Sequence, residues 1–315
     1  MKLIYTFIIS TLLFVTHNLH AQSDIERIQK HLTAITKTEG FRNFEDTVTL
    51  NKVANYIFTE FSQYADTTYY QTYTVNNVNY KNVICRFGTK QQKALVVIGA
   101  HYDVCGEQEG ADDNASGVTA ILELARLFSR SNLIRPIELV AYTLEEPPFF
   151  GTQSMGSYIH ANELKKSNTP VYGMVAVEMI GFFNDAEDSQ SYPFAPMKLF
   201  YGNKGDFILL TKKIGHGQFV KDFSKQFYNA KTIKTKSLTS PGMIKGVDFS
   251  DHRNYWALGF DAMMITNSAF YRNHNYHKSG DKMDRLDFKR MAGVIDAIYY
   301  AIINIDKSTS VKKKK

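Results

Sequence analysis

The feature that most constrains this fold is a series of short apolar segments separated by helical patterns. Ala94–Ala100 is apolar throughout, and Ile137–Thr143 and Val171–Val177 are segments of the same kind. Such runs are typical of strands buried on both faces of a sheet. Helical patterns at Gly117–Ser129 and Gly151–Leu164 lie between them. Strands that alternate with helices predict an α/β protein, namely a single three-layer α/β/α domain with a mixed, mainly parallel central sheet.

The rest of the chain predicts elements that extend this sheet and its helical layers. An Asn-rich turn between two alternating segments predicts a β-hairpin. Residues 189–246 are rich in polar and small residues, and we expect loops there that shape a substrate site. The hairpin strands are Tyr70–Val75 and Lys81–Phe87, the further strands are Met197–Tyr201 and Ala262–Thr266, and the further helices are Asp24–Thr38, Leu50–Tyr64, Asp206–Phe227 and Leu286–Ile305.

The N-terminus predicts a secretory signal peptide over residues 1–21. A short positive start precedes the almost wholly apolar stretch Leu3–Thr16, and the small residue Ala21 ends the more polar region that follows. The apolar stretch is too short for a stable membrane span, although an N-terminal anchor helix is the alternative. We therefore expect a protein exported to the periplasm or secreted, with a folded domain over residues 22–306 and a basic, disordered tail over 307–315.

The net charge of +6 does not indicate a nucleic-acid partner. Lys2 leaves with the signal peptide and four lysines end the chain, so the folded body carries only +1. A terminal run of lysines is usually a solvated tail. No later apolar run is long enough for a membrane span, and the oligomeric state does not follow from the sequence.

The sequence contains two cysteines, Cys85 and Cys105. In an oxidising compartment they can form a disulfide, but free buried cysteines also behave as small apolar residues. The sequence leaves both alternatives open. Neither cysteine fits a zinc–thiolate spacing pattern.

Polar side chains of a restricted kind follow the predicted strands. Five separate segments each bring an imidazole or a carboxylate to the carboxyl ends of these strands. Ligands bind at this edge of the sheet in open α/β folds. These segments contain His101 and Asp103, Asp112 and Asp113, Glu145 and Glu146, Glu178, and Tyr276 and His277.

Two histidines and several carboxylates form a ligand set suited to a pair of zinc ions. A carboxylate can bridge two ions while each imidazole binds one. Asp103 lies two residues after His101 and can accept the second ring N–H of that histidine, which fixes the tautomer. Each residue also has a structural interpretation: Asp112 and Asp113 as helix N-caps, for example, or Glu145 and Glu146 as an exposed pair. Their occurrence in order at strand ends favours the metal site.

These segments resemble the co-catalytic zinc exopeptidases of the aminopeptidase Y/aminopeptidase S type, whose relatives include glutamate carboxypeptidase and glutaminyl cyclase. The resemblance runs from about Ile98 to the final helix, and its aspartate segment is the most specific part. It is carried by Gly99–Asp103, Gly110–Gly117, Leu144–Glu146, Val177–Gly181, Ser250–His252 and Tyr276–His277.

The resemblance implies a fold, a reaction and a set of roles. The fold is that of zinc-dependent exopeptidases, and the reaction is hydrolysis of N-terminal residues of peptides by a metal-activated water. It also implies a cis peptide bond between Asp113 and Asn114. The implied roles are Asp113 as the bridge between two Zn²⁺ ions, His101 and Glu178 as ligands of one ion, Glu146 and His277 as ligands of the other, Glu145 as the general base, and Tyr276 as the oxyanion donor.

The chain departs from the usual family pattern in three places. Glu178 stands where the aminopeptidases usually have Asp, so its longer side chain can shift one ion. Glu146 is followed by Pro147–Phe150 instead of a short glycine-containing turn, which affects the adjacent pocket. Finally, no tyrosine immediately precedes Ser250, and for this reason Tyr276 is the expected oxyanion donor.

Two further residues have two interpretations each. His252 can line the substrate pocket, or it can lie in the first turn of a helix capped by Ser250 or Asp251, which we favour. Arg272 can meet a substrate carboxylate, although an ordinary surface arginine is the simpler expectation.

Relatives of this fold suggest other functions besides the aminopeptidase. A glutaminyl cyclase-like acyltransferase would use one zinc and surround its substrate with indole rings, but this chain has a single tryptophan, Trp256. A non-catalytic binding module would lack ligands, whereas every expected ligand is present. A carboxypeptidase or dipeptidase differs only in which substrate terminus the pocket binds.

Overall fold

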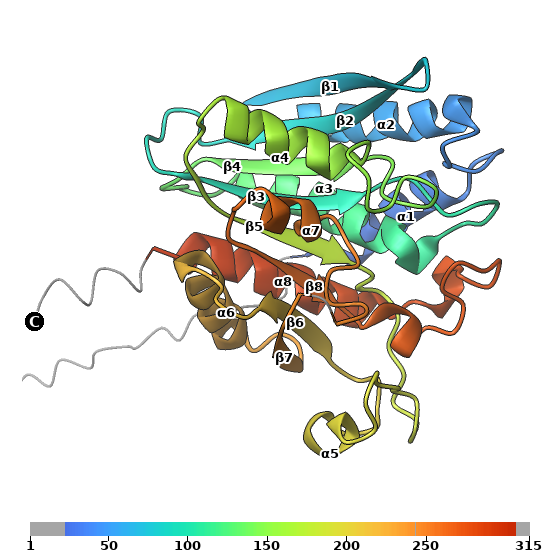
Figure 1. Cartoon of the computed structure of the whole chain (residues 1–315). Coiled ribbons are helices and arrows are strands. Elements are labelled where there is room, and N and C mark those ends of the chain that lie inside the picture. The colour runs from blue at the N-terminus through green and yellow to red at the C-terminus, as the bar shows by residue number, and fades with distance from the viewer. Residues whose placement is uncertain (1–22, 243, 307–315) are drawn as a thin grey trace, which may run out of the picture.

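The computed structural model describes residues 23–242 and 244–306. The predicted signal peptide and basic tail lie outside these residues. Figure 1 shows a twisted sheet with helices packed on both of its faces. The expected three-layer α/β/α domain with a mixed, mainly parallel sheet is confirmed. None of the helices in the described residues is long and apolar enough to cross a membrane.

The sheet has eight strands in the order β1-β2-β4-β3-β5-β8-β6-β7. The four central strands are parallel to one another, and β2 and β6 run antiparallel to their central neighbours β4 and β8. The strands are β1 (Thr67–Val75), β2 (Val78–Phe87), β3 (Leu95–His101), β4 (Ile137–Tyr142), β5 (Val171–Glu178), β6 (Ile208–Lys213), β7 (Thr235–Ser240) and β8 (Ala262–Thr266).

The helices divide between the two faces of the sheet. Helices α1, α2, α3, α6 and α8 form one connected layer, and α4 and α7 contact each other on the opposite face. The helices are α1 (Ile25–Thr36), α2 (Thr47–Ser62), α3 (Gly117–Phe128), α4 (Gly156–Lys166), α5 (Met197–Tyr201), α6 (Gln218–Ala230), α7 (His252–Ala257) and α8 (Phe288–Asn304).

The central strands are buried because their side chains face a helical layer on either side. Every residue of β3, β4 and β8 is buried. This explains why the apolar runs in the sequence show no alternation. The expected hairpin is confirmed as β1 and β2, and the helices around it lie where the periodicity placed them.

The region after β5 is where the predictions are wrong. Met197–Tyr201 was expected as a strand but forms the short helix α5, which contributes no buried residue and lies apart from the sheet in Figure 1. Asp206–Phe227 was expected as one helix but divides into β6 and α6, and the sequence did not predict β7. Gly215 at φ +78° lies between β6 and α6, where a glycine permits the left-handed turn.

Packing of α3 against the sheet and against α8 predicts a large loss of stability when a core leucine of α3 is removed. Leu124 is fully buried in α3, whereas Leu199 in α5 is 85% exposed. The Leu124→Ala variant should lose about 2–5 kcal/mol of unfolding free energy, because it leaves a cavity. The matched Leu199→Ala variant should change stability by less than about 0.5 kcal/mol. Urea denaturation of both variants measures the difference, and equal losses would contradict this description of the core.

Candidate active site

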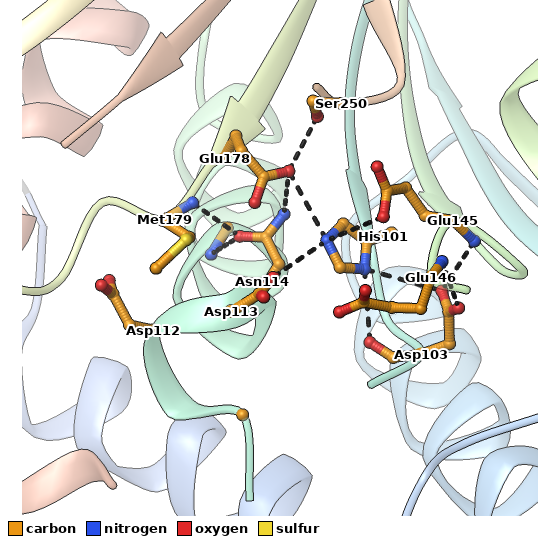
Figure 2. Close-up of polar contacts among 12 residues, drawn as sticks. His101, Asp103, Asp112, Asp113, Asn114, Glu145, Glu146, Glu178, Met179 and Ser250 are labelled. Atoms are coloured by element: carbon orange, nitrogen blue, oxygen red, sulfur yellow. Dashed lines mark hydrogen bonds and ion pairs between the residues drawn. The ribbon is translucent and has the colours of Figure 1, made fainter. Parts of the chain in front are cut away.

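The carboxyl ends of the central strands bring the expected polar side chains together, as Figure 2 shows for most of them. His101 and Glu178 are the last residues of β3 and β5. Glu145 and Glu146 follow β4, Asp113 lies in the irregular turn that precedes α3, and His277 lies in the loop after β8. The site is therefore assembled at one edge of the sheet from five segments, as the sequence predicted.

Asp113 lies between the two histidines. Its Oδ1 is 3.3 Å from Nε2 of His101, and its Oδ2 is 3.2 Å from Nε2 of His277. Burial by itself would raise the pKa of this carboxyl, but the close contacts and positive charges of the two imidazoles outweigh that effect. The pKa of Asp113 is held well below its usual range, so the group is a carboxylate. The peptide bond between Asp113 and Asn114 is cis, as expected.

Each histidine also faces a second carboxylate. Oε2 of Glu178 is 3.5 Å from Nε2 of His101, and Oε2 of Glu146 is 3.0 Å from Nε2 of His277. The ligand atoms of His101, Asp113 and Glu178 lie within 4.8 Å of one another, which is close enough to hold one metal ion. On the other side of Asp113, His277 lies close to both Asp113 and Glu146, which provides a second cluster of possible ligands.

Glu145 lies in the same site but is farther from His101 than Glu178 is. It is 6% exposed, and its Oε2 is 3.9 Å from Nε2 of His101. Burial raises the pKa of Glu145 well above its ordinary value; His101 opposes this, and the neighbouring carboxylates Glu146 and Glu178 add to it. A carboxyl with a raised pKa is suited to accept and return a proton near neutral pH.

Burial also raises the pKa of Glu146 to about 7, with a further contribution from the charge of Asp113. A raised pKa means that the negative charge is poorly compensated by the protein groups alone. A cation bound at this position would supply the missing compensation.

Asp103 supports the site differently from the prediction. Its carboxylate oxygen is 3.6 Å from Nδ1 of His101, and the nearer acceptor is the backbone carbonyl of Asp103 itself at 3.3 Å. The carboxylate instead accepts the backbone N–H groups of Glu145 at 3.3 Å and Glu146 at 3.1 Å. Asp103 therefore fixes both the ring of His101 and the turn that carries the two glutamates, because its two kinds of oxygen serve different donors.

The turn around Asp113 is held by two neighbouring carboxylates, Asp112 and Asp281, of which the sequence indicated only Asp112. Oδ2 of Asp281 accepts the backbone N–H groups of Asp112 at 3.1 Å and Asp113 at 3.0 Å. Asp112 accepts hydrogen bonds from the backbone N–H groups of Gly181 and Phe182. Asp112 is thus no helix cap: it ties the turn to the loop after β5. The only sequence signal for Asp281 was its place four residues after His277.

Asn114 and Ser250 orient Glu178. The Asn114 side chain accepts from the backbone N–H of Met179 at 3.0 Å and donates to the backbone carbonyl of Val177 at 2.8 Å, so it clamps both sides of Glu178 (Figure 2). The hydroxyl of Ser250 donates to Oε2 of Glu178 at 2.7 Å. The longer glutamate is therefore anchored at its end as well as at its backbone.

His252 and Arg272 do not line the site. His252 is buried at the start of α7, where Nε2 donates to the carbonyl of Val247 at 2.8 Å. This agrees with the structural interpretation, although neither Ser250 nor Asp251 makes a side-chain cap. The expectation of a surface or substrate-binding Arg272 is wrong. The residue is 2% exposed, and its guanidinium donates to Gln190 and to the carbonyl of Phe207.

A cavity of about 320 Å³ adjoins the carboxylates and is lined mainly by apolar side chains. Tyr276 lies in its wall and stacks on His277, with ring centroids 3.8 Å apart. Most of the wall comes from residues 190–211, 238–249 and 264–277. The expectation of substrate-shaping segments within 189–246 agrees with this placement.

Cys85 and Cys105 are both free. Cys85 is buried in β2, whereas Cys105 lies half-buried in the loop after β3. The ligand atoms of Cys105, Glu146 and His277 lie within 4.8 Å of one another. Sequence spacing did not indicate this group, because its three residues come from three separate loops.

Comparison with known proteins identifies the family to which this site belongs. The sequence model of Peptidase family M28 matches residues 82–302. The chain belongs to Peptidase family M28. This confirms the resemblance described above and places the protein in a class of peptide hydrolases.

Several curated relatives resemble the chain. The uncharacterised Escherichia coli protein YfbL is 38% identical over 287 residues, which cover 89% of this chain and 88% of YfbL. Leucine aminopeptidase 1 of Aspergillus clavatus is 27% identical over 215 residues, which cover 64% of this chain and 50% of the fungal protein. The chain thus spans about half the length of the leucine aminopeptidases that it matches.

Solved structures share the fold of this family member. The Legionella pneumophila LapA aminopeptidase aligns with a TM-score of 0.70 and 22% identity, covering 89% of this chain and 71% of LapA. A glutaminyl cyclase of Bacteroides thetaiotaomicron aligns with a TM-score of 0.65 and 17% identity, covering 90% of this chain and 98% of the cyclase. The same architecture therefore occurs in proteins named for two different reactions.

Proposed function

We propose that this chain is a two-zinc aminopeptidase that removes N-terminal residues from peptides. The observation that carries the proposal is the position of Asp113 between His101 and His277, each of which faces a further carboxylate. The relatives named leucine aminopeptidase and the fold shared with an aminopeptidase support the choice of reaction. The pattern of residues 1–21 supports export as the route by which the enzyme meets its peptides.

The protein groups fit a pair of zinc ions. Oε1 of Glu146 is buried without a hydrogen-bond partner, and Oδ2 of Asp113 and Nε2 of His277 face each other at 3.2 Å without forming a hydrogen bond. Unpaired polar atoms at such depth are costly unless a cation or ligand meets them. His101 and Glu178 would hold one ion, Glu146 and His277 the other, and Asp113 would bridge them. When bound, the ions supply Lewis-acid polarisation of the peptide carbonyl and lower the pKa of water.

Two residues of the chain would carry out the proton transfer and stabilise the oxyanion. Glu145 accepts a proton from the attacking water and returns it to the leaving amine nitrogen. Its burial, which excludes bulk solvent, maintains the raised pKa that this exchange needs. Tyr276, held against His277 in the cavity wall, is the proposed donor to the oxyanion that forms at the carbonyl.

A glutaminyl cyclase is the second candidate, because cyclases share this fold over nearly their full length. That reaction would be expected to use one zinc with Asp113, Glu146 and His277. The side chains of His101 and Glu178 would then have no ion to hold, although their ligand atoms and one of Asp113 lie within 4.8 Å of one another in the buried site. This second group favours the two-ion hydrolase.

Metal content separates the two candidates. Zinc-saturated protein should contain close to two zinc ions per chain, because two ligand groups share Asp113. Removal of the metal with a chelator should abolish peptide hydrolysis, and added zinc should restore it. Elemental analysis beside initial rates gives both readouts. One zinc at saturation with full peptide hydrolysis would contradict the two-ion proposal, and one zinc without peptide hydrolysis would favour the cyclase.

Blocked peptides test which substrate terminus the enzyme binds. A peptide with a free N-terminus and an amidated C-terminus should be shortened from its N-terminus. The same peptide with an acetylated N-terminus should remain intact, and mass spectrometry distinguishes the products. Cleavage that requires a free C-terminus would identify a carboxypeptidase, and cleavage that requires both free termini would identify a dipeptidase.

Conservative changes at the two adjacent glutamates test their separate roles. Glu145→Gln keeps the size of the side chain but removes its basicity, so both zinc ions should remain while turnover falls by about 10²–10⁴-fold or more. Glu146→Gln removes a ligand, so zinc binding should weaken and excess zinc should partly restore activity. The comparison requires metal analysis and initial rates on wild type and both variants.

The ligand atoms of His101, Glu145 and Glu146 also lie within 4.8 Å of one another, so distance alone does not distinguish the metal ligand from the general base. Loss of zinc from Glu145→Gln, together with a loaded but inactive Glu146→Gln, would reverse the two roles. Unchanged rates in both variants would remove these residues from the mechanism.

A further inference from the structure

A sulfur atom lies beside the group formed by Glu146 and His277. Cys105 follows His101 by four residues, in the loop that leaves β3. Its Sγ, a carboxylate oxygen of Glu146 and a ring nitrogen of His277 all lie within 4.8 Å of one another. These three side chains come from separate loops, so their convergence is not a result of sequence proximity.

A second observation points to a ligand at the same place. Glu146 is 4% exposed, and its Oε1 is buried without a hydrogen-bond partner. Nε2 of His277 lies 3.0 Å from Oε2 of the same glutamate but makes no hydrogen bond. Both residues belong to the group that contains the sulfur. A cation there would meet the unpaired Glu146 oxygen, and the thiol is close enough to take part.

The chemistry of the donor atoms makes the two halves of the site different. The group of His101, Asp113 and Glu178 offers one imidazole and two carboxylates. The other half adds a thiol, and thiolate is a preferred ligand of zinc. A cysteine that binds a metal releases its proton to solvent and coordinates as the thiolate.

We propose that Cys105 is a direct ligand of the metal ion held by Glu146 and His277. The inference rests on the metal site of the proposed function and adds a ligand to it. With a thiolate among its ligands, the metal position at Glu146 and His277 should bind thiophilic ions more strongly than the position at His101 and Glu178. Cys85, buried in β2, belongs to none of the possible ligand groups and has no part in it.

Cobalt substitution tests this assignment by spectroscopy independently of turnover. The apoprotein is titrated with Co²⁺ while bound metal and the near-ultraviolet absorption are both recorded. A thiolate bound to cobalt gives an intense sulfur-to-metal charge-transfer band that oxygen and nitrogen ligands do not give. Wild type and the control variant Cys85→Ala should show this band. Cys105→Ala should lack it while still binding cobalt at the His101–Glu178 group.

The titration also gives an affinity. Cys105→Ala should bind the cobalt ion of the Glu146–His277 half at least about tenfold more weakly than wild type, since even indirect partners of metal ligands contribute that much. Wild-type protein loaded with cobalt but without the band overturns the assignment of Cys105 and leaves the proposed function intact. A band that persists in Cys105→Ala overturns it as well. A chain that takes up no cobalt overturns the metal site itself, and with it the proposed function.

Discussion

The structure depends on one electrostatic constraint, the burial of four acidic side chains within a few ångströms of two histidines. Glu145, Glu146 and Glu178 are each at most 6% exposed, and burial raises the pKa of all three. Only Asp113, which lies between both imidazoles, has a lowered pKa. Buried charges of one sign are stable only when opposite charge or hydrogen bonds compensate them. The arrangement is therefore that of a protein shaped around cations.

The surrounding scaffold holds these groups in place through the backbone. Asp103, Asp112 and Asp281 accept main-chain N–H groups from the loops that carry the site residues, and Asn114 clamps the end of β5. Each of these side chains joins two segments that are distant in sequence. The loops at the sheet edge are consequently tied to one another as well as to their own strands, which limits the freedom of each possible ligand.

The sequence predicted the centre of this molecule well because burial there leaves a direct trace in the residue pattern. Strands β3 and β5 are apolar runs, and their last residues, His101 and Glu178, are the polar side chains that matter. The periphery left no such trace. Met197–Tyr201 buries none of its residues, so no periodic core face indicated a helix. Arg272 shows a second limit: its partners Gln190 and the carbonyl of Phe207 come from a distant segment, and only the tertiary structure reveals them.

The cavity wall is built largely outside the strands that carry the histidines and carboxylates. The segment after β5 contributes α5 to this wall, and residues near the two ends of the segment meet at a β-bridge between Asn184 and Gly205. Insertions, deletions or substitutions in such an excursion can reshape the wall while the sheet edge stays unchanged. Selection can thus alter which substrates are accepted without repeatedly rebuilding the reactive centre.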